Sequence, residues 1–219
     1  MVILAALFSK YIGMVILIAG NLEDIESANF KFDSNAEVII VESPTLFNLY
    51  KHADVYIYMN FEGAFYGNTE VPVLINETIK TFDEFTGLPE KVARFCGWNT
   101  FAERFFWEIS INSEKNEWIN FIMSSIGKTF AIVPDIRGLV TPRIVSSIIN
   151  EAYYLKASNI ADDASINTAM KLGTNYPYGP IEWSDKIGKS KVYNLLVSLS
   201  EKEDMKYYPC SLLKEGKRN

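Results

Sequence analysis

The stretch DDASINTAMKLGTNYPYGPIEWSDKIG, residues 162–188, decides how the second half of the chain folds. Its first part offers Asp162 as a helix N-cap and Gly173 as a C-terminal stop, which predicts a helix between them. From Lys171 to Gly188 it carries two prolines, three glycines, two tyrosines and a tryptophan. Such a segment is too rigid and aromatic for a linker and too interrupted for one helix. We therefore expect a structured turn there.

The composition is that of an ordinary folded protein. The 219 residues are 48% hydrophobic and 22% charged, which suits one large domain or two small ones. The formal net charge is −6 and the isoelectric point is about 5.0. Proteins that bind nucleic acids usually carry a basic surface, so this balance argues against DNA or RNA as a partner.

Cysteine and histidine are scarce. Cys96 and Cys210 offer neither a disulfide framework nor the spacing of a metal site, which fits a reducing, cytoplasmic location. His52 is the only histidine, so zinc bound through histidines is not expected and we predict no metal site. His52 lies where a helix should end before a strand, and it serves there either as a C-terminal cap or as a catalytic base.

The first twenty residues, MVILAALFSKYIGMVILIAG, are strongly apolar. Lys10, Tyr11 and Gly13 split them into two pieces of strand length, 2–7 and 14–19, which favours two buried strands and no membrane partner. The two pieces are close enough for an antiparallel hairpin, and one of them need not be a strand. A membrane or export segment is the alternative.

Runs rich in valine and isoleucine recur through the first half without strict polar alternation, as expected of strands buried on both faces. Besides the two above, the expected strands are 37–41, 55–59, 71–75, 92–96 and 129–133. Helical segments fit between some of them, at about 44–52, 77–86 and 114–126. This alternation predicts a parallel α/β domain over residues 1–134.

After Pro134 the pattern becomes helical. Pro142 stands at the start of one expected helix, and residues 190–203 form another, with Val192, Leu195, Leu196 and Leu199 on its inner face. We therefore predict a helical domain over residues 135–219.

The opening stretch resembles the signature of 3-hydroxyacyl-CoA dehydrogenases, D-I-D-x-A-M-x-L-G-x-x-Y-P-x-G-P-x-E-L-x-D-x-x-G. The matching residues are Ile166, Ala169, Met170, Leu172, Gly173, Tyr176, Pro177, Gly179, Pro180, Glu182, Asp185 and Gly188. Upstream, GLVTPRIVSSIINEAY (138–153) is similar to the G-F-I-V-N-R helix of that family. The resemblance covers about residues 54–216 and is fainter before residue 127.

The resemblance implies a fold of class α/β plus all-α. A shortened Rossmann-like sheet domain would precede a helical, 6-phosphogluconate-dehydrogenase-like C-terminal dimerisation domain. It also implies the family reaction, the NAD-dependent oxidation of 3-hydroxyacyl-CoA in fatty-acid metabolism. An acyl-CoA-like ligand and a homodimer formed through the helical domain would go with it.

In the resembled enzymes a histidine takes the hydroxyl proton, and a glutamate twelve residues later orients it. Here Glu108 matches the glutamate, but the histidine position is Cys96. A thiol has an ordinary pKa near 8.5. A carboxylate beside it would raise that pKa further, so Cys96 is a poor replacement for a histidine base.

Other site positions carry over unevenly from the resemblance. Pro142 stands where the family has an asparagine that supplies an amide to the substrate carbonyl, and proline has no donor. Thr78 retains the hydroxyl of a serine that contacts substrate. Asn99, Arg143 and Lys171 are the remaining candidates for substrate binding.

The dinucleotide-binding motif is missing. A Rossmann fold uses G-x-G-x-x-G after its first strand, so that the backbone approaches the pyrophosphate at a helix N-terminus. In LIAGNLED, residues 17–24, only Gly20 is present, and it is followed by Glu23 and Asp24. NAD is thus the cofactor of the family, but we do not expect it to bind here.

Two functions remain open. The first is a homologue that has lost catalysis and acts by binding or assembly. The second is an active oxidoreductase that uses an atypical site on a CoA-type substrate. The joint alteration of the base, the amide and the phosphate loop favours the first, because a fold alone does not determine function.

Overall fold

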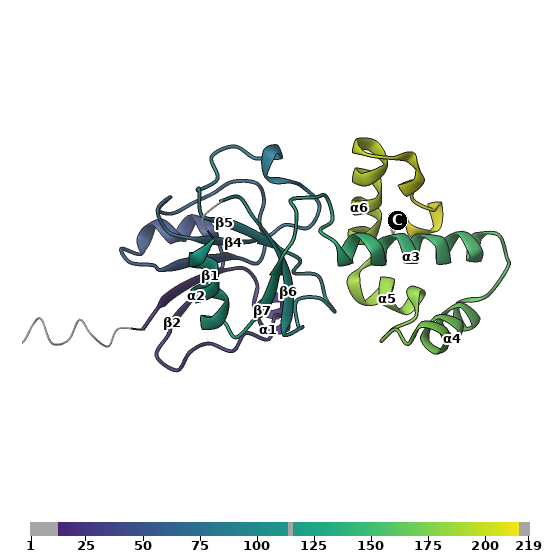
Figure 1. Ribbon diagram of the computed structural model, residues 1–219, viewed down its shortest axis with the longest axis horizontal. Coiled ribbons are helices and arrows are strands. Elements are labelled where there is room, and N and C mark those ends of the chain that lie inside the picture. The colour runs from purple at the N-terminus through teal and green to yellow at the C-terminus, as the bar shows by residue number, and fades with distance from the viewer. Residues whose placement is uncertain (1–12, 114–115, 215–219) are drawn as a thin grey trace, which may run out of the picture. The chain divides into compact units, whose positions relative to one another are not determined.

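The computed structural model describes residues 13–113 and 116–214 (Figure 1). The chain divides into two compact units. The α/β unit comprises 1–77, 81–97 and 101–135, and the helical unit comprises 78–80, 98–100 and 136–219. The predicted class, an α/β sheet followed by an all-α part, is confirmed. Among the described residues, no helix has the length and apolar character needed to cross a membrane.

The α/β unit is built on a seven-stranded sheet in the order β2-β1-β3-β4-β5-β6-β7. Its strands are β1 Val15–Ala19, β2 Glu37–Val41, β3 Val55–Tyr58, β4 Val73–Asn76, β5 Val92–Phe95, β6 Phe106–Ile111 and β7 Thr129–Ile132. All neighbouring strands are parallel except β5 and β6. The central strands are fully buried, as their continuous apolar runs require.

Helices cover one face of this sheet. Helix α1 (Leu22–Ser27) and helix α2 (Glu117–Ser125) bury Ile25, Ile119, Ile122 and Met123 against strands β1, β3, β5 and β6. The helix expected at about 114–126 thus packs its apolar residues against the sheet. Helix α1 is six residues long and lies in the parallel crossover between β1 and β2.

The opposite face is covered by short 3₁₀ turns and loops. The predicted helices 44–52 and 77–86 are wrong as α-helices. The structure has η2 (Pro44–Leu49) and η3 (Phe82–Glu84) there, each beginning at a capping residue and ending within two turns. Phe47 stacks on Tyr56 with ring centres 4.7 Å apart. This aromatic contact shields that part of the sheet from solvent, so a longer helix is not needed there.

The strand predictions for 14–19, 37–41, 55–59, 71–75, 92–96 and 129–133 are confirmed to within two residues at each end. The expected strand 2–7 lies outside the described residues. Strand β6 was not predicted. Its sequence, FWEISI, carries three exposed or half-buried residues among three buried ones. Of the aromatic residues in and before this strand, Trp98, Phe101 and Trp107 are buried, whereas Phe105 and Phe106 are exposed.

Over residues 136–214, the helical unit contains four α-helices and two 3₁₀ turns. They are α3 Thr141–Ala157, α4 Asp163–Thr174, α5 Pro180–Ile187, α6 Lys189–Lys202, η4 Met205–Tyr207 and η5 Ser211–Leu213. The four leucine and valine positions expected on the inner face of α6 are all fully buried. Helix α3 begins with Pro142 in its first turn, as expected.

The opening stretch forms the joint between α4 and α5. Gly173 lies inside α4, and the helix stops two residues later at Asn175, which adopts a left-handed conformation with φ 56°. Helix α5 was not predicted. Gly179 precedes its first residue, and Trp183 is its buried centre, with the rings of Tyr176 and Tyr178 packed edge-on at 6.1 and 5.9 Å.

Candidate functional site

The carboxyl ends of β1, β2 and β3 form a crevice in the α/β unit. From β1 the chain passes to β2 on one side and then returns to β3 on the other, so the strand order reverses between β1 and β3. Open α/β sheets bind ligands at such a reversal. A cavity of about 360 Å³ lies there, and we call it the switch-point crevice. Residues that line it include Gly20, Glu42, Ser43, Asn60, Glu62 and Tyr66.

Gly20 allows the strand ends at this crevice to approach closely. A Cβ atom at Gly20 would lie 2.6 Å from Cβ of Met59, which no side chain can tolerate. The Gly20 amide already donates to the carbonyl of Val41 at 3.1 Å. The glycine is therefore explained by the packing of β1 against its neighbours, and its amide is not directed at a ligand.

The start of α1 is filled by the protein itself. The side-chain oxygen of Asn21 accepts the amide of Asp24 at 2.8 Å, and its nitrogen donates to the Asp24 carboxylate at 2.7 Å. Glu23 adds a second carboxylate to this first turn. Because negative charge here repels a phosphate that a helix N-terminus would otherwise attract, the geometry does not fit a diphosphate.

Glu42 is a site residue that the sequence reasoning missed. It directly follows β2 and lines the crevice. In dinucleotide-binding folds, an acidic residue about 20 positions after the first strand accepts a hydrogen bond from a ribose hydroxyl. The spacing from Gly20 to Glu42 in the sequence is the signal that indicates this position.

Cys96 directly follows β5, and Glu108 lies in β6, the strand that pairs with β5. The two strands are antiparallel, and the ladder pairs Arg94 with Ser110 and Phe95 with Ile109. Cys96, which is buried, comes next after Phe95, and Glu108, which is half-buried, comes next before Ile109. A contact between the two residues stays a prediction.

Asn76 holds the turn that follows Cys96. It ends β4, accepts the amide of Gly97 at 2.7 Å and donates to the carbonyl of Met59 at 2.8 Å. A Cβ atom at Gly97 would overlap the Asn76 side chain at 2.4 Å. The carboxyl ends of β3, β4 and β5 are therefore tied together by one amide, which positions the backbone next to Cys96.

Thr78 and Asn99 belong to the helical unit although they come from the first half of the sequence. Thr78 is 3% exposed, and its hydroxyl has no hydrogen-bond partner among the described residues. Asn99 is exposed and precedes Thr100, whose φ of 73° is unusual for a β-branched residue. The indole of Trp183 donates to the Thr100 hydroxyl at 2.8 Å and helps to hold this turn.

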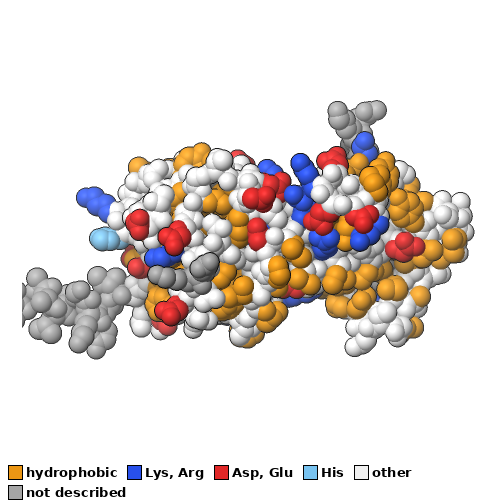
Figure 2. Space-filling view, turned by 45° about the horizontal axis from the view of Figure 1, so that its top comes forward, with side chains coloured by type: hydrophobic (Ala, Val, Ile, Leu, Met, Phe, Trp, Pro, Cys, Tyr) orange, Lys and Arg blue, Asp and Glu red, His pale blue; other side chains and the backbone are white. Residues whose placement is uncertain are grey.

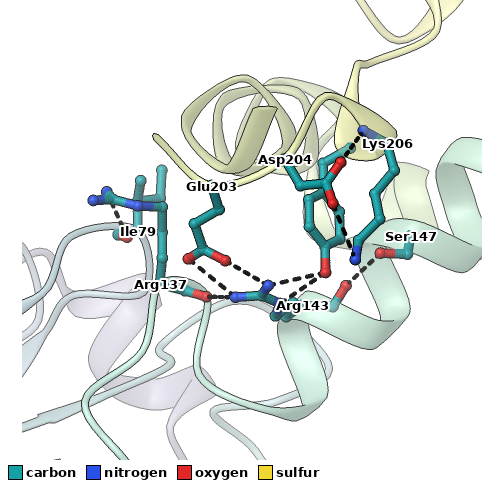
Figure 3. A network of polar contacts seen from close by, with 8 residues as sticks. Ile79, Arg137, Arg143, Ser147, Glu203, Asp204 and Lys206 are labelled. Carbon is teal, nitrogen blue, oxygen red and sulfur yellow. Dashed lines mark hydrogen bonds and ion pairs between the residues drawn. The ribbon is translucent and has the colours of Figure 1, made fainter. Parts of the chain in front are cut away.

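Arg143 is engaged within the helical unit (Figure 3). Its guanidinium makes two hydrogen bonds to the Glu203 carboxylate, at 2.5 and 3.1 Å, and two to the hydroxyl of Tyr207, at 2.9 and 3.3 Å. The hydrogen bond to Glu203 raises the pKa of Arg143 above its ordinary value. A ligand would have to displace Glu203 to reach this group.

The other basic candidate, Lys171, also has a partner, and so does Arg137. Lys171 on α4 pairs with Glu182 on α5 at 2.9 Å, and this contact lowers the pKa of Glu182. Arg137 donates to the hydroxyl of Ser198 at 2.9 Å and to the carbonyl of Ile79 at 3.4 Å. These side chains stabilise the joints of the helical unit, and substrate binding by Arg143 and Lys171 stays a prediction.

Further expectations concern His52, a metal site and the two cysteines. His52 is exposed just before β3. In the part of the chain that the structure describes, no group of three His, Cys, Asp or Glu side chains is arranged to hold a metal ion. Cys96 and Cys210 are both buried.

Comparison with known proteins identifies the second half of the chain. Residues 138–217 match the family described as 3-hydroxyacyl-CoA dehydrogenase, C-terminal domain. The chain is 38% identical over 96 residues to 3-hydroxyadipyl-CoA dehydrogenase of Escherichia coli, a match that covers 43% of this chain and 20% of that protein. It is 37% identical over 95 residues to a probable 3-hydroxybutyryl-CoA dehydrogenase of Bacillus subtilis, covering 43% and 33%. The matches thus span about a fifth to a third of these relatives.

Solved structures resemble the chain over most of its length. (S)-3-hydroxybutyryl-CoA dehydrogenase from Ralstonia eutropha superposes with a TM-score of 0.68 at 18% identity, covering 91% of this chain and 92% of that one. FadB2 from M. tuberculosis gives 0.70 at 13% identity, with 93% of each chain covered. These likenesses establish the fold, a Rossmann-type sheet domain followed by a helical one. The resemblance to the 3-hydroxyacyl-CoA dehydrogenase family is therefore confirmed, and residues 138–217 match its C-terminal domain.

Proposed function

We propose that this protein is a homologue of 3-hydroxyacyl-CoA dehydrogenases that does not catalyse the NAD-dependent reaction of that family and acts through binding and assembly. It forms a homodimer through its helical unit and holds an acyl-CoA-like ligand. NAD is not bound. A cytoplasmic location belongs to the proposal, because the chain's two cysteines, Cys96 and Cys210, offer no disulfide framework, as expected of a protein in a reducing compartment.

The observation that carries this proposal is the pair Cys96 and Glu108. The sequence keeps a glutamate, Glu108, twelve residues after position 96, as in the resembled enzymes, but the group at position 96 is a buried thiol. General base catalysis works best when the pKa of the base lies near the working pH, and the ordinary pKa of a thiol, about 8.5, lies above that of histidine. The glutamate that would orient a histidine is therefore retained, whereas the histidine that would accept the proton is replaced by cysteine.

The homodimer is supported by apolar side chains on the helical unit. Helix α4 buries only Ile166, whereas Leu172 on the same helix is 82% exposed. Ile144, Ile160, Met205, Tyr208 and Leu212 are also exposed in this unit. Figure 2 shows apolar side chains gathered over part of the molecular surface. A second copy of the chain would remove such side chains from water in a symmetric contact.

The acyl-CoA-like ligand is supported by Thr78. A buried hydroxyl without a partner costs free energy, about 1–3 kcal/mol, unless something satisfies it. The resembled enzymes place a hydroxyl at this position against substrate. The exposed Asn99, presented by the strained turn at Thr100, is the second polar group proposed to contact that ligand.

The experiment is a reductase assay with acetoacetyl-CoA and NADH, followed at the nicotinamide absorbance band. We expect no turnover above the rate without enzyme, and a Cys96→Ala variant should behave as the wild type. Cys210→Ala, a substitution of the other buried thiol, is the matched control. Turnover that Cys96→Ala abolishes and Cys210→Ala leaves intact would establish the alternative, an active oxidoreductase with an atypical site.

Ligand binding is tested separately by isothermal titration of acetoacetyl-CoA, with Thr78→Val as the variant. Valine keeps the shape of threonine but removes the hydroxyl, so it should weaken the ligand and leave folding intact. Absence of heat with the wild type at millimolar ligand would leave assembly as the only function in the proposal.

A further inference from the structure

We infer that the switch-point crevice binds an unphosphorylated nucleoside and rejects nucleotides and dinucleotides. This inference rests on the part of the proposed function that leaves NAD unbound, and it names what takes the place instead. In dinucleotide-binding folds the phosphates supply much of the attraction for the ligand, whereas in this crevice they would oppose binding. Three features of the α/β unit support it.

The first feature is Glu42. Its carboxylate stands at the carboxyl end of β2, the position from which an acidic side chain meets ribose hydroxyls. Glu42 is exposed, and within the described chain it has no hydrogen-bond or ion-pair partner. Two acceptor oxygens are thus directed toward solvent at the rim of the crevice, where they can accept hydrogen bonds from a vicinal diol.

The second feature is a preformed rim on the other side. The hydroxyl of Tyr58 accepts the amide of Tyr66 at 2.8 Å and donates to its carbonyl at 2.6 Å. The hydroxyl of Tyr56 accepts the amide of Asn68, which lies two residues after Tyr66, at 3.2 Å. The loop after β3 is therefore fixed to the sheet by two tyrosines. This loop sets the half-buried Tyr66 beside the crevice, where its ring can pack against a base.

The third feature is the charge of the crevice. Glu42 and Glu62 both line it, and none of its described lining residues is lysine or arginine. Glu23 and Asp24 occupy the first turn of α1, where a diphosphate would sit, and the amide of Asp24 is already taken by Asn21. Each phosphate added to a nucleoside therefore meets repulsion that no cation offsets.

The volume agrees with a small ligand. About 360 Å³ lies at the low end of the range for small-molecule sites, about 300 to 1,000 Å³. A nucleoside fits such a space, whereas a dinucleotide would have to extend past the carboxylates of α1.

The test is titration of the full chain with adenosine, AMP, ADP and NAD by isothermal calorimetry at low salt. We expect adenosine to bind and each added phosphate to weaken binding by about tenfold or more. Raising the salt to 0.5 M should narrow the gap between AMP and adenosine, because it screens the repulsion, and should leave adenosine unchanged. Stronger binding of ADP or NAD than of adenosine would overturn the inference, and so would the failure of every probe at millimolar concentration.

Two variants localise the site. Glu42→Gln keeps the shape but weakens the acceptor, and should lower the affinity for adenosine by about tenfold. Glu37→Gln, the same change at the exposed opposite end of β2, should leave it unchanged. Equal losses in both variants would exclude the crevice. Dehydrogenase turnover would refute the proposed function, whereas silent titrations in a protein without turnover would refute only this inference.

Discussion

The side chain of Asn167 on α4 caps the neighbouring helix α5 by accepting the amides of Ile181 at 3.0 Å and Glu182 at 3.3 Å. This contact is possible only because residue 179 is glycine. A Cβ atom there would lie 2.4 Å from Cα of Asn167. The glycine of the Y-P-x-G-P turn therefore serves the approach of two helices.

Gly179→Ala should consequently be strongly destabilising, by about 2–4 kcal/mol, because backbone rather than a flexible side chain blocks the new methyl group. Asn167→Ala should cost about 1 kcal/mol through the lost cap. Gly173→Ala is the matched control: it lies inside α4 with nothing within 4 Å, and it should be neutral or stabilising. Urea unfolding measures all three, and equal effects at 173 and 179 would contradict the packing argument.

Arg143 and Glu203 form a bidentate, partly buried pair next to an exposed pair, Lys206 and Asp204 (Figure 3). A double-mutant cycle of Arg143→Ala and Glu203→Ala should give a coupling free energy of about 1–2 kcal/mol. The same cycle at Lys206 and Asp204 should give about 0–0.5 kcal/mol, because both side chains are largely solvated. Arg143→Lys should behave nearly as the alanine variant, since an ammonium cannot make the two parallel hydrogen bonds.

Lys128 predicts an unusual dependence of stability on pH. Its buried ammonium donates to the carbonyls of Ala28, Ala102 and Arg104, and burial together with nearby Lys31 lowers its pKa to about 8. The folded state therefore releases this proton more readily than the unfolded state, whose lysine has a pKa near 10.5. The free energy of unfolding should rise between pH 8 and 10, by up to about 3 kcal/mol from this group.

The rise in the free energy of unfolding ends near pH 10, because burial raises the pKa of Tyr58 well above 10. Above that pH the unfolded tyrosine loses its proton first, and stability falls. Lys31→Gln removes the repulsive neighbour and should reduce the rise, whereas Lys91→Gln, an exposed lysine just before β5, should not. Urea unfolding from pH 7 to 10 decides this, and a flat or falling profile in the wild type would refute it.

The proposed dimer predicts the effect of a charge on α4. Wild-type protein should elute at about twice 24.9 kDa, and Leu172→Lys should shift it toward 24.9 kDa without changing its unfolding free energy as a monomer. Leu49→Lys is the control, because Leu49 is 75% exposed in the α/β unit. Light scattering after gel filtration measures the mass. A monomeric wild type, or equal effects of the two substitutions, would contradict the dimer.

Strands were predicted well because burial on both faces leaves a continuous apolar run that needs no knowledge of the partner strand. The apolar stripe of α2 and the inner face of α6 were predicted for the same local reason. Helix α5 was not predicted, because its eight residues, which begin at a Gly-Pro pair, are too few to show a helical repeat of apolar positions. The 3₁₀ turns η2 and η3 were predicted as longer helices. The sequence alone does not show the contact of Phe47 and Phe82 with the sheet, which limits these turns.

The sequence by itself determined the two-part architecture, the family resemblance of residues 138–217 and the replacements at positions 96 and 142, since these depend only on residue type and order. Only the tertiary structure decided that Cys96 follows a strand paired with the strand of Glu108, that Arg143 is engaged by Glu203, and that Glu42 lines a crevice with Tyr66. Each of these relations joins residues that are 12 to 60 positions apart. Strand pairing and helix packing create such relations, and no local pattern encodes them.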